Sequence, residues 1–128
     1  MIKQSRDSSS VPFTVAVDFD GTLTEDAGWS EVRDLKIRFG AATALTRFRE
    51  LGWYIIIWTC REQDPEIAEL LKQNAVPFDD INWNEHFGGR PGFSNKIVAD
   101  LYIDDRGFRF EGDWPKTLKE VEKLASQL

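Results

Sequence analysis

The sequence predicts an α/β fold in which a central, mainly parallel sheet is covered by helices on both faces. Short apolar runs, typical of buried strands, alternate along the chain with amphipathic segments of helical period. Consecutive parallel strands are joined by a right-handed crossover, usually a helix, so this alternation favours a parallel sheet. These observations place the chain in the α/β class.

Three short apolar segments are the predicted interior strands, and they run from Phe13 to Val17, from Trp53 to Trp58 and from Leu101 to Ile103. The second segment is too short for a typical helix and is rich in β-branched residues, which favours a strand. A further short strand is expected between Phe78 and Trp83. Asp100 stands before the third strand, at the end of the sheet opposite to Asp104, and we expect it to have a structural role.

Three further segments are predicted as helices from their periodicity and end signals. The first runs from Ala41 to Leu51, and Gly52 suits the position just after a helix. The second begins at Asp64 with Pro65 in its first turn and ends before Pro77, and the third begins near Asp113. The predicted buried faces are Ala41, Ala44, Leu45, Phe48 and Leu51 in the first helix, Ile67, Leu70, Leu71 and Ala75 in the second, and Leu118, Val121, Leu124, Ala125 and Leu128 in the third.

The composition is that of one folded domain. Of 128 residues, 41% are hydrophobic and 30% are charged, and we expect a disordered tail over residues 1–10 and a single catalytic domain over residues 11–128. The net charge of −6 opposes loose attraction to anionic lipid or nucleic acid, although it does not exclude nucleic acid as a partner. The single cysteine, Cys60, fits a reducing compartment, and no apolar run is long enough for a membrane span, so we expect a cytoplasmic protein without a membrane partner.

Polar side chains follow each of the three predicted interior strands. Asp18 and Asp20 follow the first strand, Thr59 follows the second, and Asp104 and Asp105 follow the third. The carboxyl ends of parallel strands gather at one edge of a sheet, so these residues are expected to be neighbours. Two carboxylates about 4 Å apart repel by about 4 kcal/mol at an effective dielectric constant of about 20. A hard divalent cation such as Mg²⁺ would relieve that repulsion and could also hold a substrate phosphate.

This arrangement is suited to phosphoryl transfer. Asp18 could attack a phosphorus atom whose charge a metal has neutralised, and Asp20 could protonate the leaving oxygen and later activate water. Thr59 offers a hydroxyl group and a backbone N–H to the phosphoryl oxygens. Lys96 could supply a positive charge beside the transferring group.

The order of these residues resembles the four motifs of the haloacid dehalogenase (HAD) superfamily. The resemblance rests on DFDGT from Asp18 to Thr22, on Thr59 after an apolar strand, on Lys96 before another strand, and on the acidic pair of LYIDD. It implies a Rossmann-like three-layer sandwich. The segments between the motifs are too short for the inserted cap that many members carry, so we expect no cap domain.

The resemblance also implies a role for each motif residue. Asp18 would be the nucleophile, Asp20 the general acid and base, and Lys96 the residue that steadies the nucleophile and the phosphoryl group. Mg²⁺ would be bound by the carboxylates of Asp18 and Asp104 and by the backbone carbonyl of Asp20. Asp105 would act on the metal through water or through the ligands.

Thr59, Cys60 and Arg61 are the predicted residues for binding the substrate phosphate. The Arg61 side chain either reaches the phosphate or is held elsewhere, and the sequence leaves both open. A thiol phosphatase would need an arginine six positions after its cysteine, but Glu66 occupies that position. We therefore expect the Cys60 side chain to pack rather than to react.

The sequence thus predicts a Mg²⁺-dependent phosphomonoester hydrolase that acts through an aspartyl-phosphate. Its substrate would be a small molecule or an exposed phosphate on a macromolecule. A receiver-like phosphoacceptor and a non-catalytic phosphate-binding module are the alternatives, but an acid and base two residues after the nucleophile favours turnover. Without a cap, the site would be open, closed by loops, or closed by a second copy of the chain.

Two loops, from Thr24 to Gly40 and from Trp83 to Asn95, are expected to set specificity. Their aromatic and basic residues fit stacking on a nucleobase, but partly buried rings and solvated charges are the favoured interpretation. His86 is favoured as a hydrogen-bonding loop residue. The residues concerned are Trp29, Arg33, Arg38, Trp83, His86 and Arg90.

Overall fold

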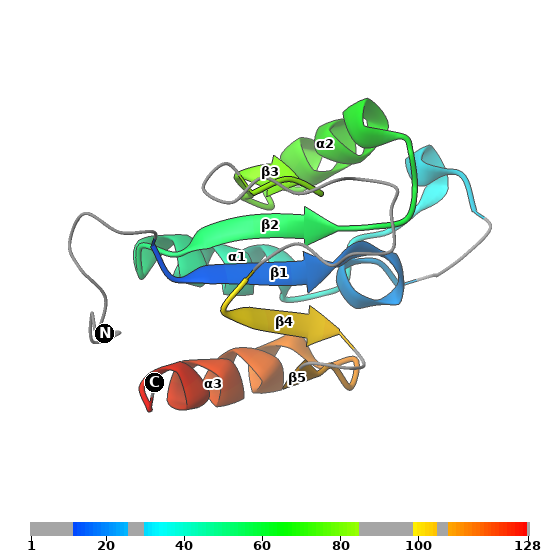
Figure 1. Ribbon diagram of the computed structural model, residues 1–128. Helices are drawn as coiled ribbons and strands as arrows, with labels where there is room; N and C mark the ends of the chain where they lie inside the picture. The colour runs from blue at the N-terminus through cyan, green and yellow to red at the C-terminus, as the bar shows by residue number, and fades with distance from the viewer. Residues whose placement is uncertain (1–11, 26–29, 85–98, 105–107, 128) are drawn as a thin grey trace.

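The computed structural model describes residues 12–25, 30–84, 99–104 and 108–127, and it contains a five-stranded parallel sheet (Figure 1). The order of the strands in the sheet is β3-β2-β1-β4-β5, and every neighbouring pair is parallel. The strands are β1 (Thr14–Asp18), β2 (Tyr54–Trp58), β3 (Asp80–Ile81), β4 (Leu101–Asp104) and β5 (Phe108–Arg109). The predicted α/β class with a parallel sheet is confirmed, and β5 is a strand that the sequence did not predict.

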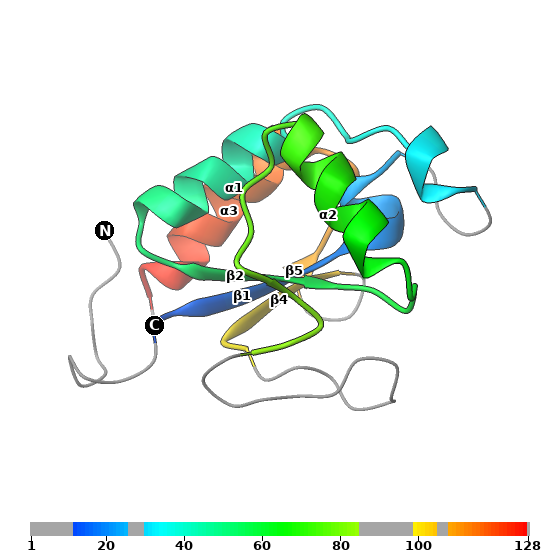
Figure 2. The same cartoon turned by 90° about the horizontal axis from the view of Figure 1, so that it is seen from above.

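Three α-helices lie on the same face of this sheet (Figure 2). They are α1 (Ala41–Glu50), α2 (Asp64–Gln73) and α3 (Trp114–Ala125). The connections from β1 to β2 and from β2 to β3 step across the sheet in the same direction, so right-handed crossovers put α1 and α2 on one face. Within the described ranges no α-helix lies on the opposite face, so the helix layers that the sequence predicted on both faces are found there on one face only. None of the described helices has the length and apolar character needed to cross a membrane.

Two short helical turns lie between β1 and α1. The turn η1 (Phe19–Leu23) follows β1 directly and has the wide hydrogen-bond spacing of a π-helix, while η2 (Val32–Asp34) is a 3₁₀ turn. Both turns lie in the short segment between the first predicted strand and the first predicted helix.

The predicted signal at one end of each helix agrees with the structure. Gly52 follows α1 with a φ of 85°, a left-handed conformation that glycine adopts without strain. The Asp113 side chain accepts a hydrogen bond from the backbone N–H of Lys116 at 3.0 Å, which caps the start of α3. Pro65 lies in the first turn of α2, where its missing N–H is not needed.

Most of the predicted buried faces are confirmed, but two positions are wrong. Leu124 is 37% exposed, because the buried face of α3 runs through Trp114, Val121 and Ala125 and so turns Leu124 toward solvent. Ala75 lies beyond the end of α2, where the chain takes a φ of 58° and its side chain is exposed, and Val76 is buried instead. Leu128 lies outside the described residues.

The described elements share one hydrophobic cluster between the sheet and the helices. Side chains from alternate positions of the central strands pack there against the helices. At the amino end of β1, the backbone N–H of Thr14 donates to the Asp100 carboxylate at 2.7 Å, so Asp100 is structural as predicted. The predicted tail over residues 1–10 and residues 85–95 of the predicted loop from Trp83 to Asn95 lie outside the described residues.

Candidate active site

The carboxyl ends of β1, β2 and β4 bring three of the predicted site residues to one edge of the sheet (Figure 1). β1 lies between the other two strands, and Asp18 is level with Trp58, which Thr59 follows. On the other side Val17 is level with Ile103, so Asp104 lies beside Asp18. Residues that are far apart in sequence therefore meet where the strands end.

Asp18 lies in an unusually unfavourable environment for a negative charge. Burial raises its pKa from the ordinary value of 3.8 to about 6, and the neighbouring charges of Asp104 and Asp20 act in the same direction. Hydrogen bonds from the Phe19 backbone and from the Thr22 hydroxyl, the latter at 3.4 Å, oppose this rise but are weaker. A bound divalent cation would offset the repulsion among these carboxylates.

The residues present fit the implied magnesium site. The predicted set needs only the carboxylates of Asp18 and Asp104 and the backbone carbonyl of Asp20, which is an all-oxygen set of the kind Mg²⁺ prefers. Within the described part of the chain, no three His, Cys, Asp or Glu side chains form a metal-binding group. Asp105 lies outside the described residues.

Asp20 is carried by the η1 turn, whose shape depends on Gly21. Gly21 has a φ of 77°, which reverses the chain immediately after the two aspartates. Its backbone N–H donates to the Thr24 hydroxyl at 3.1 Å, and the backbone N–H of Thr24 closes the turn on the Phe19 carbonyl at 3.2 Å. The sequence DFDGT therefore forms a compact turn that leads the chain away from the sheet.

Two side chains from distant segments hold this turn in place. Arg38 donates to the Gly21 carbonyl at 3.2 Å, and Trp114 at the start of α3 donates to the Thr22 carbonyl at 3.0 Å. The guanidinium of Arg38 also lies 5.4 Å from the centre of the Phe110 ring. Arg38, which the sequence favoured as a solvated charge, thus supports the turn that carries Asp20.

Arg61 forms a bidentate ion pair with Asp20. Its Nε lies 2.8 Å from Oδ1 and 3.0 Å from Oδ2 of Asp20, and its Nη2 lies 2.8 Å from Oδ1. The side chains of Arg61 and Asp20 are 13% and 24% exposed, so the pair is largely shielded from water. From the sequence, Arg61 was a candidate phosphate ligand, and the pair with Asp20 was not predicted. The available sequence signal was that Asp20 and Arg61, which carry opposite charges, follow strands that lie side by side.

Thr59 is held by Asn82, a residue that the sequence did not single out. The backbone N–H of Thr59 donates to Oδ1 of Asn82 at 2.9 Å, so it is not free for a phosphate oxygen, contrary to the sequence prediction. The Thr59 hydroxyl accepts the backbone N–H of Arg61 at 3.0 Å, and its own hydrogen remains available as a donor. Thr59 is 4% exposed, so it is buried at the carboxyl end of β2.

The remaining candidates divide between exposed residues and residues outside the described ranges. Cys60 is exposed, so the prediction that it packs is wrong, and Arg33 and Trp83 are also exposed. The candidates Trp29, His86, Arg90, Lys96 and Asp105 lie outside the described residues.

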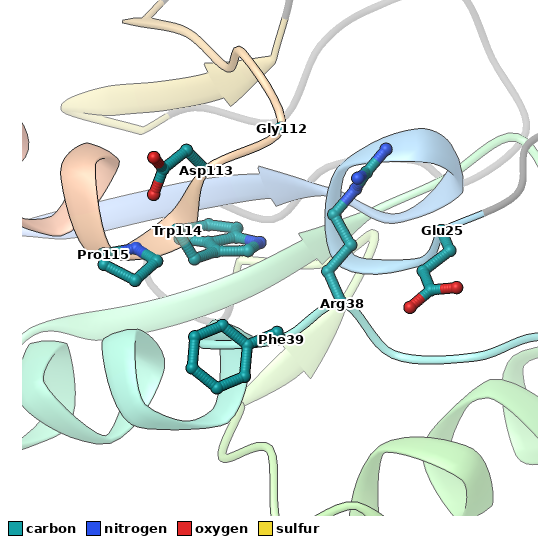
Figure 3. A pocket seen from close by; sticks show the side chains of 7 residues that line it. All are labelled: Glu25, Arg38, Phe39, Gly112, Asp113, Trp114 and Pro115. Carbon is teal, nitrogen blue, oxygen red and sulfur yellow. The ribbon is translucent and has the colours of Figure 1, made fainter.

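A cavity of about 570 Å³ adjoins the η1 turn, and its lining does not include Asp18, Asp20 or Asp104 (Figure 3). Figure 3 shows the Arg38 side chain extending along its wall toward the turn. The lining residues are Glu25, Arg38, Phe39, Gly112, Asp113, Trp114 and Pro115. The predicted site carboxylates therefore lie outside this cavity, at the edge of the sheet.

Solved structures of bacterial proteins resemble this chain, whereas no family model and no curated protein matches it. A conserved protein from Bacteroides thetaiotaomicron is 28% identical with a TM-score of 0.67, over 88% of this chain and 92% of that one. A protein from Vibrio cholerae is 26% identical with a TM-score of 0.55, over 90% and 98%. A phosphatase of the HAD enzyme superfamily from Bacteroides thetaiotaomicron is 18% identical with a TM-score of 0.39, over 95% of this chain and 40% of that one.

The chain shares its fold with the Bacteroides thetaiotaomicron and Vibrio cholerae proteins over about nine-tenths of its length. Its parallel sheet has β1 at the centre, and Asp18, Thr59 and Asp104 lie at the ends of neighbouring strands, which is the arrangement that the motif resemblance implied.

Proposed function

We propose that the chain is a Mg²⁺-dependent phosphomonoester hydrolase that acts through an aspartyl-phosphate on Asp18. The observation that carries this proposal is the gathering of Asp18, Thr59 and Asp104 at one edge of the sheet, with Asp20 on the turn that follows. The resemblance to the HAD motifs supports a phosphatase type of function. The substrate belongs to the phosphate monoesters, and the open edge suits a small molecule or an exposed terminal phosphate.

In the first step, a carboxylate oxygen of Asp18 attacks the phosphorus and the bond from phosphorus to the leaving oxygen breaks. Asp20 donates a proton to that oxygen, so an alcohol departs and Asp20 is left as a carboxylate. In the second step, Asp20 takes a proton from water as the water oxygen attacks the phosphorus. The bond to Asp18 breaks, inorganic phosphate is released and Asp20 is again protonated.

The other site residues bind and orient the phosphoryl group. The Thr59 hydroxyl donates its hydrogen to a phosphoryl oxygen, and Lys96 supplies a compact positive charge beside that group. Bound Mg²⁺, held by Asp18, Asp104 and the Asp20 carbonyl, would neutralise negative charge on the phosphoryl group.

The strand order argues against the receiver-like alternative. Flavodoxin-like sheets, to which receiver modules belong, have the order 2-1-3-4-5, whereas this sheet has the order β3-β2-β1-β4-β5. In addition, a phosphoacceptor that stores phosphate has no need of an acid and base beside its nucleophile. A non-catalytic binding module would not require Asp20 either, so both alternatives leave that residue unexplained.

Turnover of p-nitrophenyl phosphate with and without Mg²⁺ tests the proposal. We expect sustained, metal-dependent turnover that falls by at least about a hundredfold in Asp18→Asn and in Asp20→Asn, since each variant removes a reacting group. Asp34→Asn, at an exposed position in η2, is the matched control and should retain parental activity.

The alternatives give different outcomes in the same assay. A single stoichiometric phosphorylation without release of further product would support the phosphoacceptor. Binding of phosphate without any turnover, on a wide panel of monoesters, would support the binding module.

A further inference from the structure

We propose that Arg61 is a positioning residue that orients the Asp20 carboxyl group for proton transfer. The proposal deepens the function proposed above and rests on it. It assigns Arg61 to the acid and base rather than to the substrate phosphate, which is the role that its place after Thr59 suggested.

The geometry of the ion pair specifies the direction of the Asp20 carboxyl group. Oδ1 of Asp20 accepts from Nε of Arg61 at 2.8 Å and also lies 2.8 Å from Nη2, whereas among the described residues Oδ2 accepts from Nε alone, at 3.0 Å. A planar guanidinium that meets a carboxylate along two N–H groups fixes the plane of that carboxylate, which a point charge cannot do. Oδ1 is therefore the anchored oxygen, and Oδ2 is the oxygen that exchanges the proton.

Arg61 is itself held by two other segments of the chain. Its Nη1 donates to the Ser30 carbonyl at 2.9 Å, and its backbone N–H donates to the Thr59 hydroxyl at 3.0 Å. The residue thus connects the turn after β1, the start of the following loop and the end of β2. The backbone of Arg61 contacts Thr59 and its guanidinium contacts Asp20. Arg61 therefore fixes the position of the proposed proton donor relative to the proposed phosphate ligand.

This role has a specific consequence for the first chemical step. In that step the proton on Oδ2 of Asp20 moves to the leaving oxygen as the bond from phosphorus to that oxygen breaks. Such a transfer requires a donor within hydrogen-bond reach of the oxygen, and a small misplacement lowers the rate strongly. Loss of the orienting contact should therefore matter most for leaving groups that depend on protonation.

The experiment measures kcat and KM for a series of para-substituted phenyl phosphates, from p-nitrophenyl phosphate to unsubstituted phenyl phosphate. We expect Arg61→Lys to lower kcat/KM by about tenfold or more for phenyl phosphate but only a few-fold for p-nitrophenyl phosphate, with KM nearly unchanged. Arg61→Gln should show the same trend. Asp20→Asn should show the steepest dependence on the leaving group, and adding Arg61→Lys to it should cause little further loss.

Arg49→Lys is the matched control, because Arg49 pairs with Asp79 at 2.9 Å on the surface, outside the site. It should leave the whole series unchanged. An Arg61→Lys loss that is equal across the series and accompanied by a raised KM would show a phosphate ligand instead and overturn the positioning role. An inactive parent would overturn the proposed function itself, which is a different result from an active parent with a uniform loss.

Discussion

Asn82 holds both backbone polar groups of Thr59. Its Oδ1 accepts the Thr59 N–H at 2.9 Å, and its Nδ2 donates to the Thr59 carbonyl at 2.7 Å. Asn82 is 1% exposed and has a φ of 55°, a left-handed conformation that asparagine tolerates better than most residues. The residue beyond the short strand β3 therefore fixes the end of β2, where the proposed phosphate ligand lies.

Asn82→Gly should destabilise the protein and lower its activity. Glycine keeps the positive φ, so the change removes the two hydrogen bonds without adding backbone strain. Leaving the buried N–H and carbonyl of Thr59 unpaired should lower the free energy of unfolding by roughly 2 to 4 kcal/mol, measured by urea denaturation. Because Thr59 is then less well placed, kcat/KM on an aryl phosphate should fall as well.

Asn74→Gly is the control for the Asn82 prediction. The Asn74 side chain makes one hydrogen bond, to the Leu70 carbonyl at 2.8 Å, in the exposed turn after α2. Its loss should lower stability by about 1 kcal/mol and leave activity unchanged. Equal effects of the two substitutions would show that Asn82 has no special role at Thr59.

The place of the site could be predicted from the sequence because it depends on backbone topology. Apolar runs that end in Asp18, Thr59 and Asp104 predict strands, and the carboxyl ends of parallel strands share an edge. The same patterns predict α1 and β2 with ends that agree with the structure to within about two residues, whereas α2 ends at Gln73, earlier than Pro77 indicated.

The supporting contacts could not be predicted, because they depend on side-chain directions in loops. The pair of Arg61 and Asp20 and the clamp of Asn82 on Thr59 join segments whose relative orientation no periodicity encodes. The buried face of α3 was misjudged for a related reason. The buried face begins with the large ring of Trp114, which the prediction from the later apolar positions left out.

Trp114→Phe should be more damaging than Trp53→Phe, although both rings are buried. Trp114 donates from Nε1 to the Thr22 carbonyl at 3.0 Å, so phenylalanine leaves that carbonyl without this donor. The Nε1 of Trp53 is buried and has no hydrogen-bond partner among the described residues, so its removal carries no such penalty. We expect Trp114→Phe to lower the free energy of unfolding by about 1 to 3 kcal/mol more than Trp53→Phe.

Activity provides a second measure in this comparison. Trp114 supports the η1 turn that carries Asp20, whereas Trp53 stacks on Phe48 at a ring distance of 4.9 Å. Only Trp114→Phe should therefore lower kcat. If both variants lose the same stability and keep parental kcat, the hydrogen bond to Thr22 has no functional role.

Gly40→Ala and Gly52→Ala separate backbone strain from close packing. Both glycines have a left-handed φ, 87° and 85° respectively, so alanine should cost each about 1 kcal/mol in strain. At Gly40 an added Cβ would also lie 3.0 Å from Cδ of Pro115 and 3.0 Å from Cβ of Trp114, whereas at Gly52 it would meet no atom within 4 Å. Gly40→Ala should therefore be less stable by a further 1 to 3 kcal/mol, roughly, in denaturation experiments. Equal losses would mean that α1 and α3 are packed less closely at this point.

The raised pKa of Asp18 makes the stability of the metal-free protein depend on pH. Burial and the charges of Asp104 and Asp20 raise this pKa from 3.8 to about 6 in the folded state, so the folded protein holds the proton more tightly than the unfolded chain does. The stabilising contribution of the protonated group is complete below about pH 4 and is lost as the pH rises through about 6. At pH 7.5 the charged group then lowers stability by on the order of 3 kcal/mol.

Asp18→Asn, which removes the charge at nearly constant shape, should therefore be more stable than the parent above pH 6 in the presence of EDTA. The difference should shrink as the pH falls through 6 and approach zero only below the unfolded pKa of 3.8, where Asp18 becomes neutral in both the folded and the unfolded chain. Adding Mg²⁺ at pH 7.5 should reverse the order, because the cation binds the folded parent through Asp18 and offsets the repulsion from Asp104, whereas the variant has lost that ligand. Urea denaturation at four pH values, with the exposed Asp34→Asn as control, measures both effects. A constant difference between Asp18→Asn and the parent at every pH would contradict the electrostatic account, and equal stabilisation of the two proteins by Mg²⁺ would remove Asp18 from the metal site.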